Sequence, residues 1–180
     1  MWLYRKVQSI IDCFEIEIEI PSDPVKQAIT WSQYKKCNSL KYLISAEPHG
    51  FINFISPGYG GRATDKIIVE TSGYLDVVPA NAHIMADRGF KQVAGVLSAK
   101  KCILVRPPSV STSEKSTKAE VKESKRIAAL RIHIERVIRR IREFHMLKMH
   151  SCVNHKILYL FDYIVIIVCG LINTQDLIIK

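Results

Sequence analysis

The sequence predicts a mixed α/β fold in which a five-stranded mixed sheet is flanked by helices. Apolar residues alternate at period two near the N-terminus, which is typical of a strand. In the middle of the chain, short apolar runs bounded by Gly and Pro alternate with helical patterns. A stripe of apolar residues at three- and four-residue spacing follows in the C-terminal part. The 180 residues, with 48% hydrophobic and 24% charged residues, are expected to form one domain over residues 1–180.

The first strand is predicted over residues 9–20, "SIIDCFEIEIEI". Isoleucines and Phe14 share one face, and three glutamates share the other. Asp12 lies on the apolar face, where a carboxylate without a partner costs free energy. Pro21 and Pro24 end the strand.

The middle of the chain predicts four further strands and two helices. Residues 28–39 are interpreted as a polar connection or a short helix. Strands are predicted over 40–48 and 50–60 with a hairpin turn at 48–50, then over 82–87 and 101–108. Helices are predicted over 66–75, with Thr64 or Asp65 as the N-cap, and over 90–101.

A long helix is predicted from near Thr117, with Glu120 as its capping-box partner, through Leu147. Its apolar stripe comprises Ile127, Leu130, Ile134, Val137, Ile138, Ile141 and Phe144. A last helix is predicted over 156–172. The order is therefore three strands, a helix, a strand, a helix, a strand and two helices, which is the layout of a ribonuclease-H-like fold.

The charge of the chain indicates a polyanionic partner. The formal net charge is +9, so nucleic acid is the first candidate, and ribosomal-type or membrane-surface binding stays open on charge alone. Five scattered cysteines without a CxxC pair indicate a reducing compartment. The apolar run at 157–172 is interrupted by Asp162 and is shorter than the roughly 20 residues of a membrane span, so a core helix and no membrane association are expected.

Three acids stand out by position. Asp12 is on the first strand, Asp87 ends the fourth, and Glu135 lies at the margin of the stripe on the long helix. The first and fourth strands are neighbours in this layout, and three converging carboxylates suit Mg²⁺ or Mn²⁺. The alternative is that each acid is only ion-paired, for example Glu135 with Arg131 or Arg139 one turn away.

Basic and aromatic residues near these acids predict phosphate contacts. Two groups are candidates for DNA binding: Arg88, Arg131, Arg136, Arg139 and Arg140 around the acids, and Trp31, Tyr34, Lys35 and Lys36 between the first two strands. A solvated helix face and a packed tryptophan are the alternative readings of these groups. The histidines and cysteine at 145–155 match no standard zinc spacing.

Several segments together resemble the DDE superfamily endonuclease domain of Harbinger-type transposases, particularly those found beside THAP-type zinc fingers in animal proteins. These segments are "IIDCFEI", "WSQYKKCNSLKYLISAEPHGFINFISPGYGGRATDKIIVE", "IMADRGF" and "RIAALRIHIERVIRRI". The resemblance runs from about residue 9 to 175 and implies that Asp12, Asp87 and Glu135 are the catalytic, metal-binding acids. The separation of 48 residues (135 − 87) fits the family. Asp65 matches another recurrent acid, either a helix cap, a residue behind the ligands or a ligand itself.

The resemblance implies a nuclear enzyme that binds Mg²⁺ or Mn²⁺ and cleaves or transfers DNA phosphodiester bonds. Three departures from the family pattern leave an alternative. Phe14 replaces a small hydroxyl residue, residues 106–121 lack an aromatic residue and a glutamine, and the chain starts shortly before Asp12, so we expect no N-terminal DNA-binding module. Such a module sometimes resides on a separate partner protein. The alternative is a domesticated, catalytically inactive derivative that binds DNA or protein.

Overall fold

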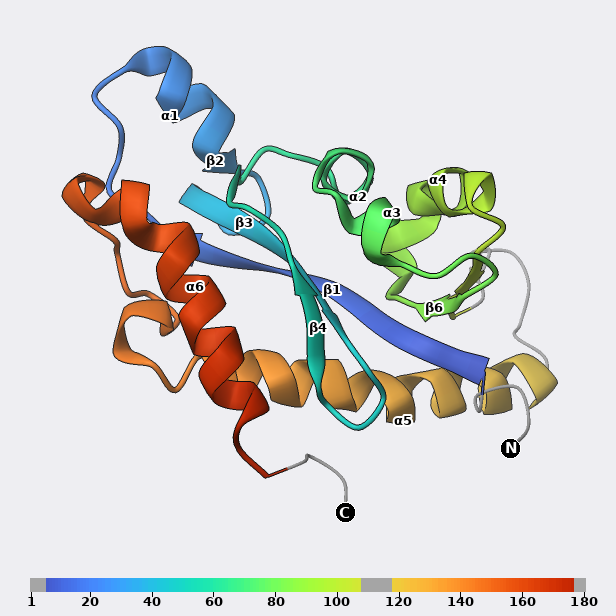
Figure 1. Ribbon diagram of the computed structural model, residues 1–180. Coiled ribbons are helices and arrows are strands. Elements are labelled where there is room, and N and C mark those ends of the chain that lie inside the picture. Colours follow the sequence, from blue (N-terminus) through green and yellow to red (C-terminus); the bar gives the residue numbers. More distant parts are fainter. Residues whose placement is uncertain (1–5, 108–117, 177–180) are drawn as a thin grey trace.

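The computed structural model describes residues 6–107 and 118–176, and a mixed sheet forms its centre (Figure 1). Its strands are β1 (Val7–Glu17), β2 (Trp31–Ser32), β3 (Cys37–Ala46), β4 (Ile52–Ile55), β5 (Tyr59–Gly60), β6 (His83–Met85) and β7 (Ile103–Val105). The continuous order is β2-β3-β1-β6-β7, and β4 and β5 also pair with β3. β1 is antiparallel to β3 and parallel to β6, which is in turn parallel to β7.

The five predicted strands are confirmed as β1, β3, β4, β6 and β7, and so is the mixed α/β, ribonuclease-H-like class. The strand predicted over 50–60 divides into β4 and β5, and β2 was not predicted, because a two-residue strand shows no periodicity. The predicted hairpin joins β3 to β4. Gly50 has a φ of +100° there, and the amide of Glu47 donates to the carbonyl of Phe51 over 2.8 Å.

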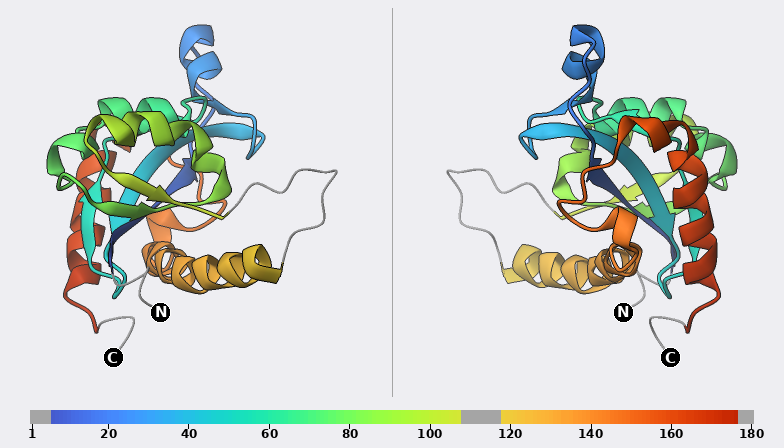
Figure 2. Two further views of the ribbon diagram at one scale, coloured as in Figure 1. Left: turned by 90° about the vertical axis from the view of Figure 1, so that its right-hand side faces the viewer. Right: turned by 90° about the vertical axis from the view of Figure 1, so that its left-hand side faces the viewer.

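Helices cover both faces of the sheet. The helical elements are α1 (Pro24–Thr30), α2 (Asp65–Thr71), α3 (Tyr74–Val77), η2 (Arg88–Val93), α4 (Ala94–Ala99), α5 (Lys118–Ile141), η3 (His145–Leu147), η4 (His155–Ile157) and α6 (Leu158–Asn173). Figures 1 and 2 show α5 and α6 on one face, α2, α3 and α4 on the other, and α1 projecting from the body. The residues 28–39, predicted as a connection or short helix, divide among the end of α1, β2, a turn and the start of β3.

Each face of the sheet has its own apolar core. The larger core joins β1, β3 and β4 to α5 and α6, and the smaller joins the opposite face to α2, α3, η2 and α4. The predicted stripe of α5 is confirmed, because Ile127, Ile134, Val137 and Ile141 are buried and the other members are partly buried against the same core.

The long helix ends at Ile141, so the prediction that it continues through Leu147 is wrong. The amides of Glu143 and Phe144 bond to carbonyls three residues back, which tightens the last turn and ends the helix. Arg142 then donates to the carbonyls of Leu147 and Glu15, over 3.0 and 2.6 Å, and holds the returning chain. The predicted start near Thr117 lies outside the described residues.

The last helix, α6, is held to the sheet by two polar side chains. Asp162 Oδ1 accepts from the Tyr42 hydroxyl over 2.8 Å and from the amide of Gly58 over 3.0 Å. Asn173 bonds to both the amide and the carbonyl of Ile52, each over 2.8 Å. By length and composition alone, the stretch His155–Asn173 is also apolar enough to cross a membrane.

Candidate functional site

Strand register places Asp12 and Asp87 at the same level of the sheet. Ile10 of β1 is paired with Met85 of the parallel strand β6. Each acid lies two residues after the paired residue of its own strand. Because β1 and β6 run parallel, the two acids lie at the same end of the sheet. The strand pairing that the sequence predicted therefore brings the first two acids together at one end of the sheet.

Asp12 is half-buried, and its surroundings raise its pKa. Its Oδ1 accepts a hydrogen bond from the backbone amide of Cys13 over 2.8 Å. Burial, which disfavours the charged form, raises the pKa from 3.8 to about 6, and the charges of Asp87 and Asp65 add to the rise. The Cys13 amide and the charge of Arg131 act in the opposite direction. Asp12 therefore lies within the electrostatic field of two further acids.

Asp87 caps the 3₁₀ helix that follows β6. Its Oδ1 accepts from the amide of Arg88 over 2.6 Å, and this N-cap turns the chain away from the sheet. The side chain is 45% exposed, so it remains accessible from the cleft. Gly89 follows with an ordinary backbone conformation, and a Cβ there would come no closer than 4.0 Å to Asp65.

Glu135 reaches the acids from α5 through an ion-pair bridge. Arg131, one turn earlier, places Nη1 2.9 Å from Asp87 Oδ1 and Nη2 3.7 Å from Glu135 Oε1. The ion-paired alternative for Glu135 is thus the arrangement observed. Arg131 was predicted to contact DNA, but its guanidinium is directed at two of the acids.

Asp65 is the first residue of α2, and Thr64 is the cap of that helix. Thr64 Oγ1 accepts from the amide of Ile67, whereas Asp65 Oδ1 lies 2.7 Å from Lys41 Nζ. Both members of this pair are largely shielded from solvent. Of the roles considered for Asp65, the cap belongs to its neighbour, and Asp65 is the partner of a buried lysine.

All four acids line one open cleft of about 650 Å³. Its other charged and aromatic lining residues are Phe14, Glu15, Tyr34, Lys35, Lys41, Phe90 and Arg142. The strands β1 and β6, the start of α2 and the side of α5 thus contribute an acid each to the same space. This convergence of acids from separate elements is the feature that short-range sequence patterns cannot show.

The donor set of the cleft fits a divalent cation in chemistry and charge. Mg²⁺ and Mn²⁺ prefer carboxylate oxygens, and a cation would offset both the burial of the Asp12 charge, which is the main cause of its raised pKa, and the charges of Asp87 and Asp65. Over residues 6–107 and 118–176, however, no three acidic, histidine or cysteine side chains are already close enough to hold a metal. The guanidinium of Arg131 instead supplies a positive charge between Asp87 and Glu135.

The predicted DNA-contacting residues of the β2 region fall at the mouth of the cleft. Tyr34 and Lys35 line it, and Lys35 Nζ lies 5.1 Å from the centre of the Tyr34 ring. Lys36 lines an adjoining hollow of about 270 Å³ that shares Glu15, Lys35, Arg142 and Met149 with the cleft. Trp31 is partly exposed on β2 and lies outside the lining of the cleft.

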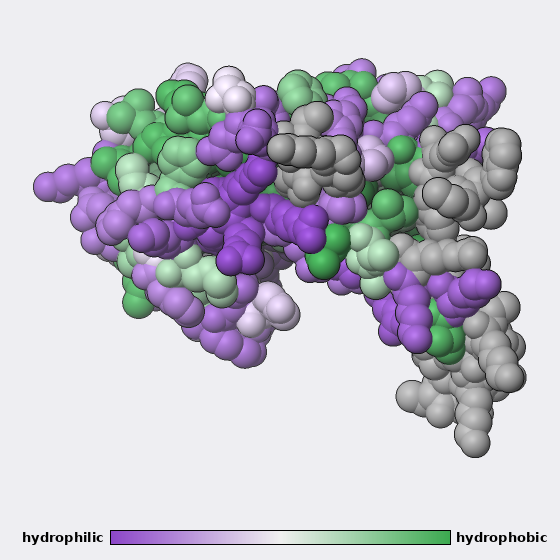
Figure 3. Space-filling model, turned by 90° about the horizontal axis from the view of Figure 1, so that it is seen from below, coloured by the Kyte–Doolittle hydropathy of each residue, from purple (hydrophilic) through white to green (hydrophobic). Residues whose placement is uncertain are grey.

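Some arginines of α5 have exposed side chains, and others are hydrogen-bonded within the protein. Arg136 and Arg139 are exposed, as is Arg88 beside Asp87. Arg140 instead donates to the carbonyl of Asp176 over 2.8 Å. Figure 3, which views the underside formed by α5, shows hydrophilic side chains across its middle and hydrophobic side chains beside them.

Phe14, which departs from the family pattern, belongs to the core. Its ring is buried and stacks on Tyr42 with a centroid separation of 5.6 Å. The guanidinium of Arg142 lies 5.6 Å above the same ring while it donates to two backbone carbonyls. The departure therefore fills a packing position next to Asp12, and the cleft is lined at this point by an aromatic ring and not by a hydroxyl group.

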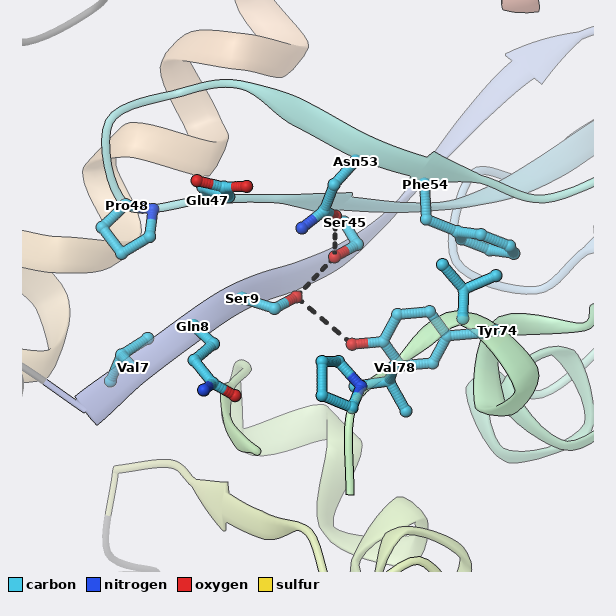
Figure 4. Close-up of a pocket in the computed structure, with 12 residues that line it drawn as sticks. Val7, Gln8, Ser9, Ser45, Glu47, Pro48, Asn53, Phe54, Tyr74 and Val78 are labelled. Carbon is cyan, nitrogen blue, oxygen red and sulfur yellow. Dashed lines mark hydrogen bonds between the residues drawn. The ribbon is translucent and has the colours of Figure 1, made fainter. Parts of the chain in front are cut away.

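A second cavity, of about 450 Å³, lies at the other end of β1 (Figure 4). Ser45 donates to Asn53 over 2.7 Å, so the hydroxyl of Ser9 must donate to Ser45, and that of Tyr74 to Ser9 over 3.2 Å. Each hydroxyl hydrogen in this series of hydrogen bonds therefore has an acceptor. The series links α3 to three strands. The residues that line the cavity include no cluster of acids.

The ion-pair partner of Asp65, Lys41, was not predicted from the sequence. Lys41 lies in β3 between Leu40 and Tyr42, and a lysine within such an apolar strand is a signal that it has a buried partner. The identity of that partner required the fold, because α2 is separated from β3 by two other strands along the chain.

Comparison with known proteins gives one family match. The family described as DDE superfamily endonuclease matches residues 11–173, which covers both sheet faces and all four acids. No curated protein matches the chain.

Proposed function

Because the chain belongs to the DDE superfamily endonucleases over residues 11–173, we propose that it is a divalent-metal-dependent DNA endonuclease domain derived from a Harbinger-type transposase. The family generally uses divalent metals. The observation that carries the proposal is the common register of Asp12 and Asp87 on parallel strands, with Glu135 lining the same cleft.

In this proposal Asp12, Asp87 and Glu135 hold Mg²⁺ or Mn²⁺, and Asp65 supports them through its pair with Lys41. The bound ions supply an activated oxygen nucleophile and neutralise charge on the leaving oxygen. The carboxylates would hold the ions where the reacting phosphate enters the cleft, and the Arg131 guanidinium would have to release the oxygens of Asp87 and Glu135 for metal to bind. Tyr34, Lys35 and Lys36 receive the DNA strand at the mouth of the cleft.

The test is nicking of supercoiled plasmid DNA in Mg²⁺ or Mn²⁺. Asp12→Asn, Asp87→Asn and Glu135→Gln should each lower the nicking rate on the order of 100-fold or more, because each removes a charge from the site of phosphate chemistry. Asp76→Asn, an exposed acid on α3 outside the cleft, is the matched control and should cut normally. Equal nicking rates for Asp87→Asn and Asp76→Asn would contradict the proposal.

A second candidate is a domesticated derivative that binds DNA or protein without cutting. The ion pairs of Arg131 favour it, because a guanidinium already satisfies Asp87 and Glu135. Calorimetric titration with Mn²⁺ separates the two candidates. Binding that Asp12→Asn abolishes supports the endonuclease, and no binding at millimolar Mn²⁺ supports the derivative.

The same proposal places the protein in the nucleus, with DNA as its substrate and a separate DNA-binding protein for target choice. Exposed arginines offer phosphate contacts, and the cleft lining shows no set of side chains arranged to read bases. Imaging of the tagged chain in animal cells tests the location. Co-purification from those cells with a DNA-binding protein, lost on mutation of a surface residue, tests the partner.

A further inference from the structure

The helix α6 exposes an uncharged apolar stripe on the side turned away from the core. Its large members are 42–75% exposed, and they are Tyr159, Leu160, Tyr163, Ile166, Ile167 and Leu171. They recur at three- and four-residue spacing, as in the seam of paired helices. Phe161, Val165 and Val168 on the opposite side are buried, so the helix is apolar on both sides.

Charge is absent from this stripe for a structural reason. Asp162 is the one charged residue of α6, and it is turned inward to Tyr42 and Gly58. A chain with a net charge of +9 repels a copy of itself over most of its surface. On an uncharged face that repulsion is weakest, and the face also offers nothing to the phosphates of DNA.

Gly170 leaves a flat place near the C-terminal end of the stripe. A Cβ at this position would meet no atom within 4 Å, so the fold of one chain does not require a glycine there. Glycine weakens a helix relative to alanine, and it permits close approach from outside. An antiparallel copy of α6, centred between Ile166 and Ile167, would place its Tyr163 over this position.

The size of the stripe suits a weak, symmetric dimer. Six large side chains at about half exposure offer roughly 500 Å² of apolar surface, against about 800 Å² per partner in a standard interface. We propose that the exposed stripe of α6 is a homodimer interface in which two α6 helices pack antiparallel about a two-fold axis. The dimer dissociates in the micromolar range, and its formation does not depend on the proposed nuclease activity.

A membrane is the other partner that the composition of α6 suggests. The helical stretch His155–Asn173 has 19 residues and spans about 28 Å, close to a hydrocarbon core of about 30 Å, so its length alone is compatible with a membrane. Crossing would, however, extract Asp162 and Asn173 from their bonds to the sheet. The stripe lacks the Lys and Arg residues by which helices lying on membranes bind lipid headgroups.

Analytical ultracentrifugation of the full chain, from low to high micromolar concentration, tests the dimer. Ile166→Glu should raise the dissociation constant at least about 100-fold, because it buries an unpaired charge at the axis. Gly170→Leu should do the same by steric exclusion, without disturbing the monomer. Val25→Glu, an equally exposed apolar position on α1, is the control and should dimerise normally.

Cross-linking tests the antiparallel register. In a Cys152→Ser background, which removes the exposed cysteine, Ile167→Cys should be captured as a dimer by a short bismaleimide and Tyr159→Cys should not. Equal capture of both, a monomer at every concentration, or sedimentation unchanged by both stripe variants would overturn the proposal. Flotation of the chain with neutral phosphatidylcholine vesicles, lost in Ile166→Glu, would overturn it in favour of a membrane.

Discussion

The guanidinium of Arg131 lies 2.9 Å from the carboxylate of Asp87, so a cation from α5 is paired with the acid that ends β6. The second arm of the same guanidinium faces Glu135. A divalent ion bound by these acids must compete with Arg131 for their oxygens. The strength of this ion pair therefore controls how readily the cleft accepts a metal.

Replacing Arg131 with glutamine is expected to tighten Mn²⁺ binding about tenfold, or roughly 1.4 kcal/mol. The substitution removes the competing charge and keeps a side chain of similar length. Isothermal titration calorimetry gives the dissociation constant. Arg139→Gln makes the same charge change at an exposed position of the same helix, so it controls for general electrostatics. Equal affinities for the two variants would contradict the competition.

Asp12→Asn is expected to stabilise the metal-free protein at neutral pH while it abolishes metal binding. The pKa of Asp12 is about 6 in the folded protein and 3.8 in the unfolded chain, so the ionised carboxylate costs at most about 3 kcal/mol above pH 6. Between pH 4 and 6 the folded state binds more protons, so wild-type stability falls as the pH rises.

The measurement for Asp12 is urea unfolding from pH 4 to pH 8 in the presence of a chelator. The stability difference between Asp12→Asn and wild type should grow through this window and level off above pH 7. Asp76→Asn, at an exposed acid outside the cleft, is measured alongside as the control. A difference that stays constant with pH would show that burial of the Asp12 charge is not its cause.

The partly buried pair of Lys41 and Asp65 is expected to matter more than an exposed pair. Lys41→Met leaves the Asp65 carboxylate shielded and unpaired, and it should lower the free energy of unfolding by about 1–3 kcal/mol. Lys66→Met breaks an exposed pair with Glu70 on α2 and should change it by less than about 0.5 kcal/mol. Thermal unfolding of both variants at one pH compares them directly.

Substitution by alanine is expected to lower the stability of the fold at Gly58 and to raise it at Gly95. A Cβ on Gly58 would lie 2.7 Å from the Tyr42 hydroxyl and 3.0 Å from Asp162, so Gly58→Ala should cost about 1–3 kcal/mol by disturbing their hydrogen bond. Gly95 lies in α4 with open space around it, and Gly95→Ala should stabilise the fold by up to about 1 kcal/mol. Denaturant midpoints measured side by side give the sign of each effect.

The exposed arginines of α5 are expected to differ from Arg140 in DNA binding. Arg139→Gln should weaken binding to any duplex and reduce the slope of log affinity against log salt by about 1. Arg140→Gln should have less effect, because that guanidinium donates to the carbonyl of Asp176. Fluorescence anisotropy at several salt concentrations measures both slopes, and identical slopes would contradict the distinction.

The main elements of the fold were predictable because their periodicity is strong. The alternation in β1 and the stripe from Ile127 to Ile141 are each set by one buried face, which a linear pattern records directly. The end of α5 was not predictable in this way. Phe144 continues the apolar spacing, but Arg142 bonds to backbone carbonyls from distant segments and turns the chain.

The candidate site was predictable only in part for a similar reason. Asp12 and Asp87 could be placed together because parallel strand pairing follows from the element order. The pair of Arg131 with Glu135 lies within one helix at i,i+4 spacing, and it was among the alternatives that the sequence offered. The pairs Lys41–Asp65 and Arg131–Asp87 join different elements, and packing of those elements, which no local spacing encodes, decides their approach.

The parallel pairing of Ile10 with Met85 also has a consequence for how this site would be lost over time. Asp12 and Asp87 are assembled by the same strand pairing that completes the sheet, so a folded descendant inherits their positions. Glu135 lies on the exposed margin of a helix and has no part in the core. In a lineage released from selection for cutting, the fold would not oppose replacement of any of the three acids, while the sheet would continue to hold positions 12 and 87 side by side.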